Sequence, residues 1–326
     1  MATARPVQVR QWAQEHGEVG GVHASHRRLT VTLRSEGHDV RYVDTGSPSR
    51  AVRALPSAWG RRSLHLFHIT RLWRAIVLAP VFAVLPGRTV LVLHSGSTLA
   101  QVRRLGRVGT VVLRLTLHAY DEIWAVNDEI GKVLPGVLRD RVRVVTPFTP
   151  MPHDPSLEAT ARDPHAVVVA TNAGLEHYHA DLAVDAVRRV RATAWPDATL
   201  RILAYGHDGE QLTTLRRLVA GHPWVTLTFD SPAHEVAQVL RASAVFLRPT
   251  AWDGDSVIVR EALAAGARVV ASDTCPRPQG VELAALDARS LADALVDGGR
   301  PSTGSGLSTT TMLDATHDAA AVVAGR

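Results

Sequence analysis

The sequence predicts an α/β protein built from two doubly wound domains, each with a parallel sheet. The chain has 326 residues, which is more than one ordinary core needs and suits two domains of roughly 100–200 residues. Hydrophobic residues make up 46% and charged residues 21%, the balance of a globular protein. Short β-branched runs alternate with segments of helical length in both halves, which is typical of parallel strands with helices on both faces of a sheet.

The predicted strands are short apolar runs bounded by polar or glycine-containing segments. They are Val7–Val9, Asp39–Val43, Leu64–Ile69, Arg88–His94, Glu122–Val126 and Val142–Thr146 in the first half, and Ala166–Ala170, Thr199–Ala204, Trp224–Phe229, Ala244–Leu247 and Arg268–Ser272 in the second. Helices are expected between them, for example at Val22–Ser35, which Gly37 ends.

The stretch PFTPMPHDPSLEATARDP separates the two halves and has no helical or strand period, as expected of a linker. We therefore predict one domain over residues 1–154 and another over 155–300. Residues 301–326 begin with small, polar and breaker-rich sequence, which predicts a flexible tail with a short helix near Met312–Val323.

Charge is divided unevenly between the halves. Residues 1–150 hold 21 basic and 10 acidic side chains, a net +11, and residues 151–326 hold 15 and 21, a net −6. The basic half either faces an anionic partner, such as a phosphorylated acceptor or a membrane surface, or is a solvated basic face. The apolar segment Leu72–Arg88 suits either a membrane surface or a buried helix broken near Pro80, and we favour the buried helix.

The single cysteine, Cys275, has no partner for an internal disulfide, which favours a reducing compartment. The N-terminal sequence lacks an apolar signal run, and no later stretch approaches the ~20 apolar residues that cross a bilayer. We expect a cytoplasmic protein whose membrane contact, if any, is peripheral and made at the inner face by the basic N-terminal domain.

The most informative segment for function reads FLRPTAWDGDSVIVREALAAGARVVASDTCPRPQGV, from Phe246 to Val281. Its loop, Arg248–Asp255, follows a predicted strand and precedes a helix, so it lies at the sheet edge where open α/β folds bind ligands. Backbone amides of residues 255–257, Ser256 among them, would attract a phosphate there. Gly254 would let the ligand approach the backbone closely.

Two carboxylates in this segment suit the two ends of a nucleotide-sugar. Glu261, on the helix, could accept hydrogen bonds from both hydroxyls of a ribose, and Asp253, eight positions earlier, could do the same for a sugar. The alternative is structural: Asp255 or Ser256 caps the helix, and Glu261 is a surface residue.

The same segment resembles the donor-site signature of retaining GT-B glycosyltransferases of family 4, which has an acidic residue, seven others and a glutamate on a helix ending in Ala-Gly. Asp253 and Glu261 take the acidic positions, and the run EALAAGARVVASD matches closely. The pattern RPT, DGDSV and REAL resembles a bacterial subgroup associated with polysaccharide and natural-product glycosylation. The resemblance implies a GT-B fold, with an N-terminal acceptor-binding and a C-terminal donor-binding Rossmann-like domain facing a central cleft.

In the first half the resemblance is weaker but follows the same order. Gly20 and Gly21 match a glycine turn whose helix faces the donor diphosphate, and His94 matches a histidine that faces the reacting sugar. Asn127 takes the place of a serine and is a candidate on the acceptor side. His177 is a further candidate for contact with phosphate or acceptor.

One departure from the family pattern concerns the diphosphate. Family members place an arginine and a lysine, five residues apart, after the first strand of the second domain, whereas this chain has Ala173 and Tyr178 at those positions. Each charge-assisted hydrogen bond is worth about 1.5–3 kcal/mol, so another cation is needed. We expect Arg248 or Arg277 to supply it, and we expect Arg260 to lie at the surface.

The resemblance implies transfer of a sugar, with retention of configuration, from a nucleotide-diphosphate sugar, most simply a UDP- or GDP-sugar, to an acceptor hydroxyl. The acceptor would be a saccharide, a lipid-linked molecule or a small molecule, and no nucleic acid is expected. No cofactor and no metal site are expected, because Asp253 and Asp255 precede a helix N-terminus and suit capping and sugar contacts better than magnesium. Two alternatives stay open: a non-catalytic GT-B partner protein, and a sugar-nucleotide epimerase of the same fold.

Overall fold

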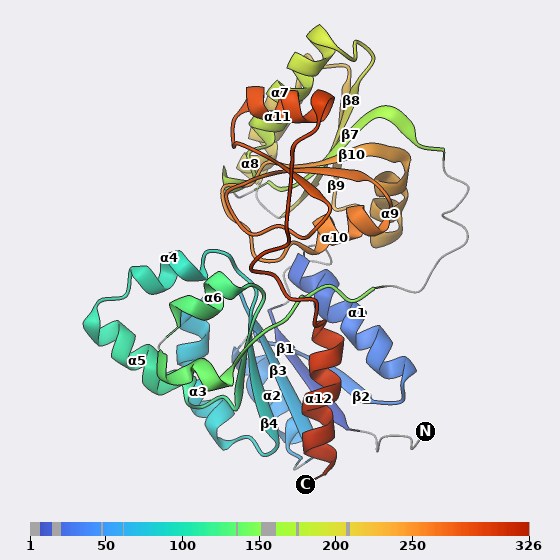
Figure 1. The fold of residues 1–326 in the computed structure, drawn as a ribbon. Coiled ribbons are helices and arrows are strands. Elements are labelled where there is room, and N and C mark those ends of the chain that lie inside the picture. The colour runs from blue at the N-terminus through green and yellow to red at the C-terminus, as the bar shows by residue number, and fades with distance from the viewer. Residues whose placement is uncertain are drawn as a thin grey trace. The chain divides into compact units, whose positions relative to one another are not determined.

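A computed structural model describes residues 7–14, 21–46, 48–60, 62–134, 136–150, 161–173, 176–206 and 209–325 (Figure 1). The chain forms two compact units. Unit 1 includes Val22–Met151 and Gly306–Arg326, and unit 2 includes Pro152–Ser305. The chain therefore leaves unit 1, forms unit 2 and returns to unit 1 for its last residues.

The sheet of unit 1 has six parallel strands in its described part, in the order β2-β1-β3-β4-β5-β6. They are β1 (Gln8–Ala13), β2 (Asp39–Asp44), β3 (Ser63–Ile69), β4 (Arg88–Leu93), β5 (Glu122–Ala125) and β6 (Val142–Val144). Every residue of β3 is buried, as expected for a central strand with helices on both faces.

Helices cover both faces of this sheet. The face of α1 and α12 buries one apolar cluster, and the face of α2, α3 and α5 buries another (Figure 1). The helices of unit 1 are α1 (Gly21–Ser35), α2 (Pro48–Ala58), α3 (Trp73–Val84), α4 (Thr98–Arg103), α5 (Arg107–Leu117), α6 (Asp128–Val133) and α12 (Met312–Ala324), with a 3-10 helix at Gly136–Arg141.

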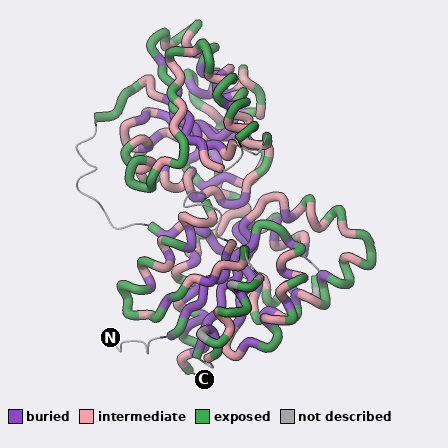
Figure 2. The backbone as a smooth tube through the Cα atoms, turned by 180° about the vertical axis from the view of Figure 1, so that it is seen from behind, coloured by how far each residue is buried: buried purple, intermediate pink, exposed green. Residues whose placement is uncertain are grey.

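In unit 2 the described residues form a seven-stranded sheet in the order β13-β12-β11-β10-β7-β8-β9, parallel except for β13. The strands are β7 (Asp163–Asn172), β8 (Thr199–Tyr205), β9 (Val225–Phe229), β10 (Ser243–Arg248), β11 (Arg268–Ser272), β12 (Val281–Ala284) and β13 (Arg300–Pro301). Helices α7 (Ala180–Thr193), α8 (Gly209–Val219) and α11 (Ala288–Asp297) pack on one face, and α9 (Ala233–Ala242) and α10 (Val257–Ala264) on the other. Figure 2 shows the buried residues gathered in the middle of each unit.

The predicted fold class is confirmed: two α/β units, each with a parallel-dominated sheet. Two expectations about particular segments are wrong. The C-terminal segment forms the short helix expected near Met312–Val323, but it is not a flexible tail, because α12 buries Met312, Ala315 and Val323 against the sheet of unit 1. A capping box of Thr311 and Asp314 starts this helix.

The second correction concerns the apolar segment Leu72–Arg88, which was expected to be a buried helix broken near Pro80. Helix α3 continues through Pro80, and only one of its sides is buried, with Ala75, Ala79 and Phe82 in the core. Its other side is exposed. No helix of the described residues is long and apolar enough to cross a membrane.

Candidate functional site

In unit 2 the candidate site is the loop between β10 and α10, at the carboxyl edge of the sheet. Asp253 lies in this loop between two arginines. The Oδ2 atom of Asp253 is 2.9 Å from Nε and from Nη2 of Arg248, and 3.0 Å from Nη1 of Arg277. Three segments of the chain therefore meet here: the end of β10, the loop itself and the segment after β11.

Both guanidinium groups are buried and fixed by further hydrogen bonds. Arg248 donates to the carbonyl oxygen of Ala170 at 3.1 Å. Arg277 donates to Thr250 Oγ1 at 2.6 Å and to Ser272 Oγ at 3.1 Å. Buried charges need such partners because an unpaired charge in the interior is costly.

The electrostatics of this cluster favour its charged form. Burial alone would raise the pKa of Asp253, but the charges of Arg248 and then Arg277 outweigh it and lower the pKa to about 2. At neutral pH the three side chains carry one negative and two positive charges. The cluster of Arg248, Asp253 and Arg277, called the arginine cluster below, therefore has a net charge of +1.

The arginine cluster lies beside a position that carries a cation in the resembled family. The Arg248 guanidinium carbon is 4.6 Å from the ring centroid of Tyr178, the residue that takes the place of the family's lysine. The Tyr178 hydroxyl lies 2.8 Å from that of Tyr205. A buried positive charge thus lies against the ring of Tyr178.

Helix α10 begins directly after the loop, and Ser256 is its N-cap residue without a side-chain capping bond of its own. Asp255 is buried and accepts hydrogen bonds from Arg260 Nε at 2.7 and 2.9 Å. Arg260 was expected at the surface, but it turns back to Asp255 and its side chain is only 18% exposed. The Gly254 amide donates to Asp253 Oδ1 at 3.2 Å, and Glu261 lies half-buried one turn into α10.

His177 packs against this loop. Its ring stacks on Trp252 with 3.5 Å between ring centroids and 11° between planes, and its carbonyl oxygen accepts a hydrogen bond from the Ala251 amide. Burial lowers the pKa of His177 to about 4, with help from Arg248 and against the effect of Asp253. The half-exposed Trp252 beside Asp253 was missed by sequence reasoning, because a lone tryptophan in a loop carries no motif.

In unit 1 the predicted residue His94 belongs to a group of histidines at the carboxyl ends of β3 and β4. His94 Nε2 lies 2.9 Å from His68 Nδ1, and the two rings stack with centroids 5.1 Å apart. Among the described residues, the other ring nitrogen of His68, Nε2, is buried and has no hydrogen-bond partner. His26 of α1 lies 6.1 Å from His68, between ring centroids.

Burial keeps these histidines neutral. It lowers the pKa of His94 to about 3 and that of His26 to about 4, and it holds the pKa of His68 well below the ordinary value. A neutral imidazole can donate at one nitrogen and accept at the other, so the pair of His68 and His94 can hydrogen-bond a hydroxyl group.

The remaining residues predicted in the first half of the chain have different outcomes. Gly21 is the first residue of α1 and is exposed, while Gly20 lies outside the described residues. Asn127 is buried, and its side-chain oxygen accepts from the Ile130 amide at 2.9 Å. Asn127 is therefore the N-cap of α6, and this structural role explains an asparagine at that position without any contact to a ligand.

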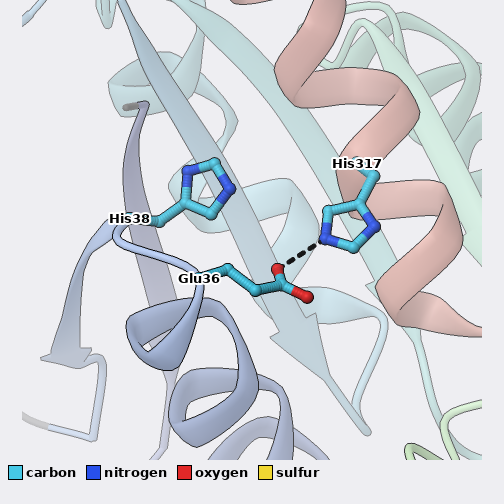
Figure 3. Close-up of side chains that lie close together, drawn as sticks. All are labelled: Glu36, His38 and His317. Atoms are coloured by element: carbon cyan, nitrogen blue, oxygen red, sulfur yellow. Dashed lines mark hydrogen bonds and ion pairs between the residues drawn. The ribbon is translucent and has the colours of Figure 1, made fainter. Parts of the chain in front are cut away.

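One group of side chains in the described part of unit 1 could hold a metal ion: Glu36, His38 and His317, with ligand atoms within 4.8 Å of one another (Figure 3). His317 Nε2 lies 2.7 Å from Glu36 Oε2, joining the end of α1 to α12. His38 Nδ1 accepts from the Val7 amide at 3.3 Å, so in a neutral ring Nε2 carries the proton. With Nδ1 already accepting a hydrogen bond and Nε2 protonated, the His38 ring has no free nitrogen lone pair for a metal ion.

Part of the chain matches a known family model. Residues 164–297 match the family model described as Glycosyl transferases group 1, and this range holds Arg248, Asp253, Glu261 and Arg277. No curated protein sequence matches the chain.

Several solved structures share the fold. Sucrose-phosphate synthase from Thermosynechococcus elongatus is 15% identical with a TM-score of 0.62, and the match covers 89% of each chain. The catalytic domain of starch synthase IV from Arabidopsis thaliana, bound to ADP and acarbose, is 12% identical with a TM-score of 0.63, over 99% of this chain and 100% of that one.

The pneumococcal O-GlcNAc transferase GtfA, in complex with UDP and GlcNAc, is 15% identical with a TM-score of 0.56 over 85% of this chain. The chain spans little more than half of that protein and of TarM, 56% and 52% of their lengths. At these identities the likeness establishes architecture, and the chain has the GT-B fold of two Rossmann-like units, the second of which matches the group 1 glycosyltransferase model.

Proposed function

We propose that the protein is a glycosyltransferase that moves a sugar from a nucleotide-diphosphate sugar to an acceptor hydroxyl with retention of configuration. The observation that carries this proposal is the arginine cluster at the carboxyl edge of unit 2, directly before the N-terminus of α10 and within the range that matches the family model. A net positive charge beside the N-terminus of a helix suits a diphosphate.

Unit 2 binds the donor in this proposal. Glu261 accepts hydrogen bonds from the ribose, Asp253 orients the sugar, and the amides at the start of α10 contact the phosphates together with the arginine cluster. Each arginine already pairs with Asp253, so the cluster offers the diphosphate one positive charge rather than two. This charge replaces the arginine and lysine that other family members use and this chain lacks. It also replaces a metal ion.

The reaction follows from these contacts. The bond between the anomeric carbon and the phosphate oxygen breaks while the acceptor oxygen bonds to the same face of that carbon, and the leaving phosphate takes the acceptor's proton. The protein supplies positioning and charge stabilisation. In unit 1, His94 donates a hydrogen bond from Nδ1 to a hydroxyl of the reacting sugar. Its neutral ring then accepts at Nε2 a hydrogen bond that His68 Nδ1 donates.

The test begins with binding. Thermal unfolding of the full chain is measured with UDP, GDP, ADP, dTDP and their common sugar conjugates, and a ligand at 100 times its dissociation constant adds about 2.7 kcal/mol of stability. We expect one nucleotide series to raise the melting temperature and its sugar conjugate to be consumed when an acceptor is added, with the same rate in EDTA. A chain that binds no nucleotide-sugar is a non-catalytic partner protein, and one that forms an epimer without acceptor is an epimerase.

Variants then assign the roles. Glu261→Ala is expected to abolish transfer and weaken the nucleotide at least tenfold, since a lost charge-assisted bond costs about 1.5–3 kcal/mol. Arg277→Gln is expected to weaken the nucleoside diphosphate but not the uncharged nucleoside. Equal weakening of both ligands would show that Arg277 only supports the fold of the loop. Arg289→Gln, an exposed arginine on α11, is the control.

A further inference from the structure

Helix α5 of unit 1 presents an apolar stripe to solvent. Val108, Val111, Val112 and Leu115 follow the spacing i, i+3, i+4, i+7 of one helix face and are 40–79% exposed. The opposite side of α5 buries Leu113 and Leu117 in the core. Surface helices normally turn polar residues outward, so an outward apolar stripe needs an explanation.

Helix α3 continues this exposed apolar surface. Trp73, Val77 and Val84 lie on its outer side and are 52–64% exposed. Helices α3 and α5 pack against each other (Figure 1), so these exposed side chains lie on adjacent helices. These seven side chains are called the α3–α5 face below.

Positive charge surrounds the α3–α5 face. The stretch from residue 45 to residue 120 contains eleven arginines and no aspartate or glutamate. Within the described part of the chain, the exposed residues Arg71, Arg103, Arg104, Arg107 and Arg114 form no ion pair with a carboxylate. The stretch of sequence that contains α3 and α5 thus accounts for the whole net +11 of the N-terminal half.

We propose that the α3–α5 face docks on a membrane surface rich in anionic lipids. Apolar side chains enter the boundary between headgroups and acyl chains, arginines contact the lipid phosphates, and a tryptophan such as Trp73 prefers this interface. A second copy of the chain fits less well, because a symmetric pairing of this face would bring arginine against arginine. The inference goes beyond glycosyl transfer and does not depend on it.

Binding to vesicles tests this proposal without any enzyme assay. The full chain is floated with vesicles of phosphatidylcholine alone or with 30% phosphatidylglycerol, at low and at physiological salt. We expect flotation only with the anionic vesicles, and weaker flotation as salt rises. A chain that fails to float with anionic vesicles at low salt overturns the proposal.

Two sets of variants locate the surface. The double variant Val111→Asp and Leu115→Asp is expected to abolish flotation, while Val322→Asp, at an exposed valine on α12, leaves it unchanged. The double variant Arg104→Gln and Arg107→Gln is expected to lower the vesicle partition coefficient about 30-fold, since each arginine near an anionic surface contributes about 1 kcal/mol.

Light scattering of the same proteins separates a membrane from a second copy. All substituted side chains are exposed, so unchanged circular dichroism and melting curves are expected for every variant. A wild-type dimer that Val111→Asp with Leu115→Asp converts to monomer would assign the face to self-association and overturn the membrane proposal. Flotation of that double variant equal to wild type would overturn it as well.

Discussion

The arginine cluster predicts a large loss of stability when Asp253 is neutralised. Asp253→Asn keeps the shape of the side chain but removes the negative charge between two buried guanidinium groups, whose nitrogen atoms lie 2.9–3.0 Å from its Oδ2 atom. The lowering of the Asp253 pKa from 3.8 to about 2 corresponds to roughly 2–3 kcal/mol in favour of the folded state, at about 1.4 kcal/mol per unit. Because two cations also lose their partner, we expect a total loss of about 3–5 kcal/mol.

Urea unfolding at pH 7 measures this loss, and hydrogen exchange of peptides from β7 and β10 assigns it to unit 2. With a slope of about 2 kcal/mol per molar urea, the midpoint should fall by about 2 M. Asp273→Asn, an exposed aspartate just after β11, is the control and should stay within about 0.5 kcal/mol of wild type.

A double variant sharpens the test. Adding Arg277→Gln to Asp253→Asn removes one of the two unpaired cations, so the double variant should be more stable than Asp253→Asn alone. A loss below about 1 kcal/mol for Asp253→Asn would refute the reasoning, because it would mean that water or another group already neutralises the arginines. The stabilisation by Asp253 is complete above pH 3.8 and should disappear as the pH falls toward 2.

Three further predictions concern unit 1. Burial lowers the pKa of His94 from 6.5 to about 3, so below pH 6.5 the unfolded chain binds a proton there that the folded chain does not. His94 alone should therefore lower the stability by about 2 kcal/mol between pH 6.5 and 4.5, and His26 and His68 act in the same direction. Urea unfolding at both pH values measures this fall, and His94→Asn should remove about one proton from the slope. Gly87→Ala should destabilise unit 1 by about 3 kcal/mol or more, because Gly87 has φ +110° and a Cβ atom would lie 2.2 Å from a backbone oxygen of β3. At Gly106, the N-cap of α5, a Cβ atom meets nothing within 4 Å, so Gly106→Ala should cost no more than about 1 kcal/mol in the same melting assay. Deleting residues 306–326 should leave unit 1 without cooperative unfolding, since α12 covers a buried apolar cluster; an unchanged near-UV circular dichroism spectrum of the truncated chain would contradict this.

The parallel strands could be predicted because most of them are buried on both faces and therefore appear as continuous β-branched runs. Strand β11 was predicted with the same bounds as the structure shows, and β3 within one residue. The short strands β12 and β13 were missed, because four and two residues carry too little pattern. The helix at Met312–Val323 was predicted within one residue of α12, but its packing on unit 1 was missed, because the serine- and glycine-rich sequence before it indicated a flexible tail.

The candidate site could be predicted only as a set of residues along one stretch. The loop position of Asp253 follows from the order of strand, loop and helix, but its two arginine partners depend on how β10 and β11 align in the sheet. The pairing of His68 with His94 could have been predicted from the sequence, because each histidine lies near the end of one of two successive strands. The stacking of His177 on Trp252 joins residues 75 positions apart, and no local pattern indicates it.

The return of the chain to unit 1 also sets an order for folding during synthesis. Helix α12 covers the face of the unit 1 sheet that holds Leu64, Val90 and Trp124, yet residues 152–305 must be made before it exists. At about 5–20 residues per second this takes roughly 8–30 s, during which unit 2 can form its own sheet. Unit 1, although it begins first, completes its core last, and its uncovered apolar face is the part of the nascent chain that most needs protection from aggregation.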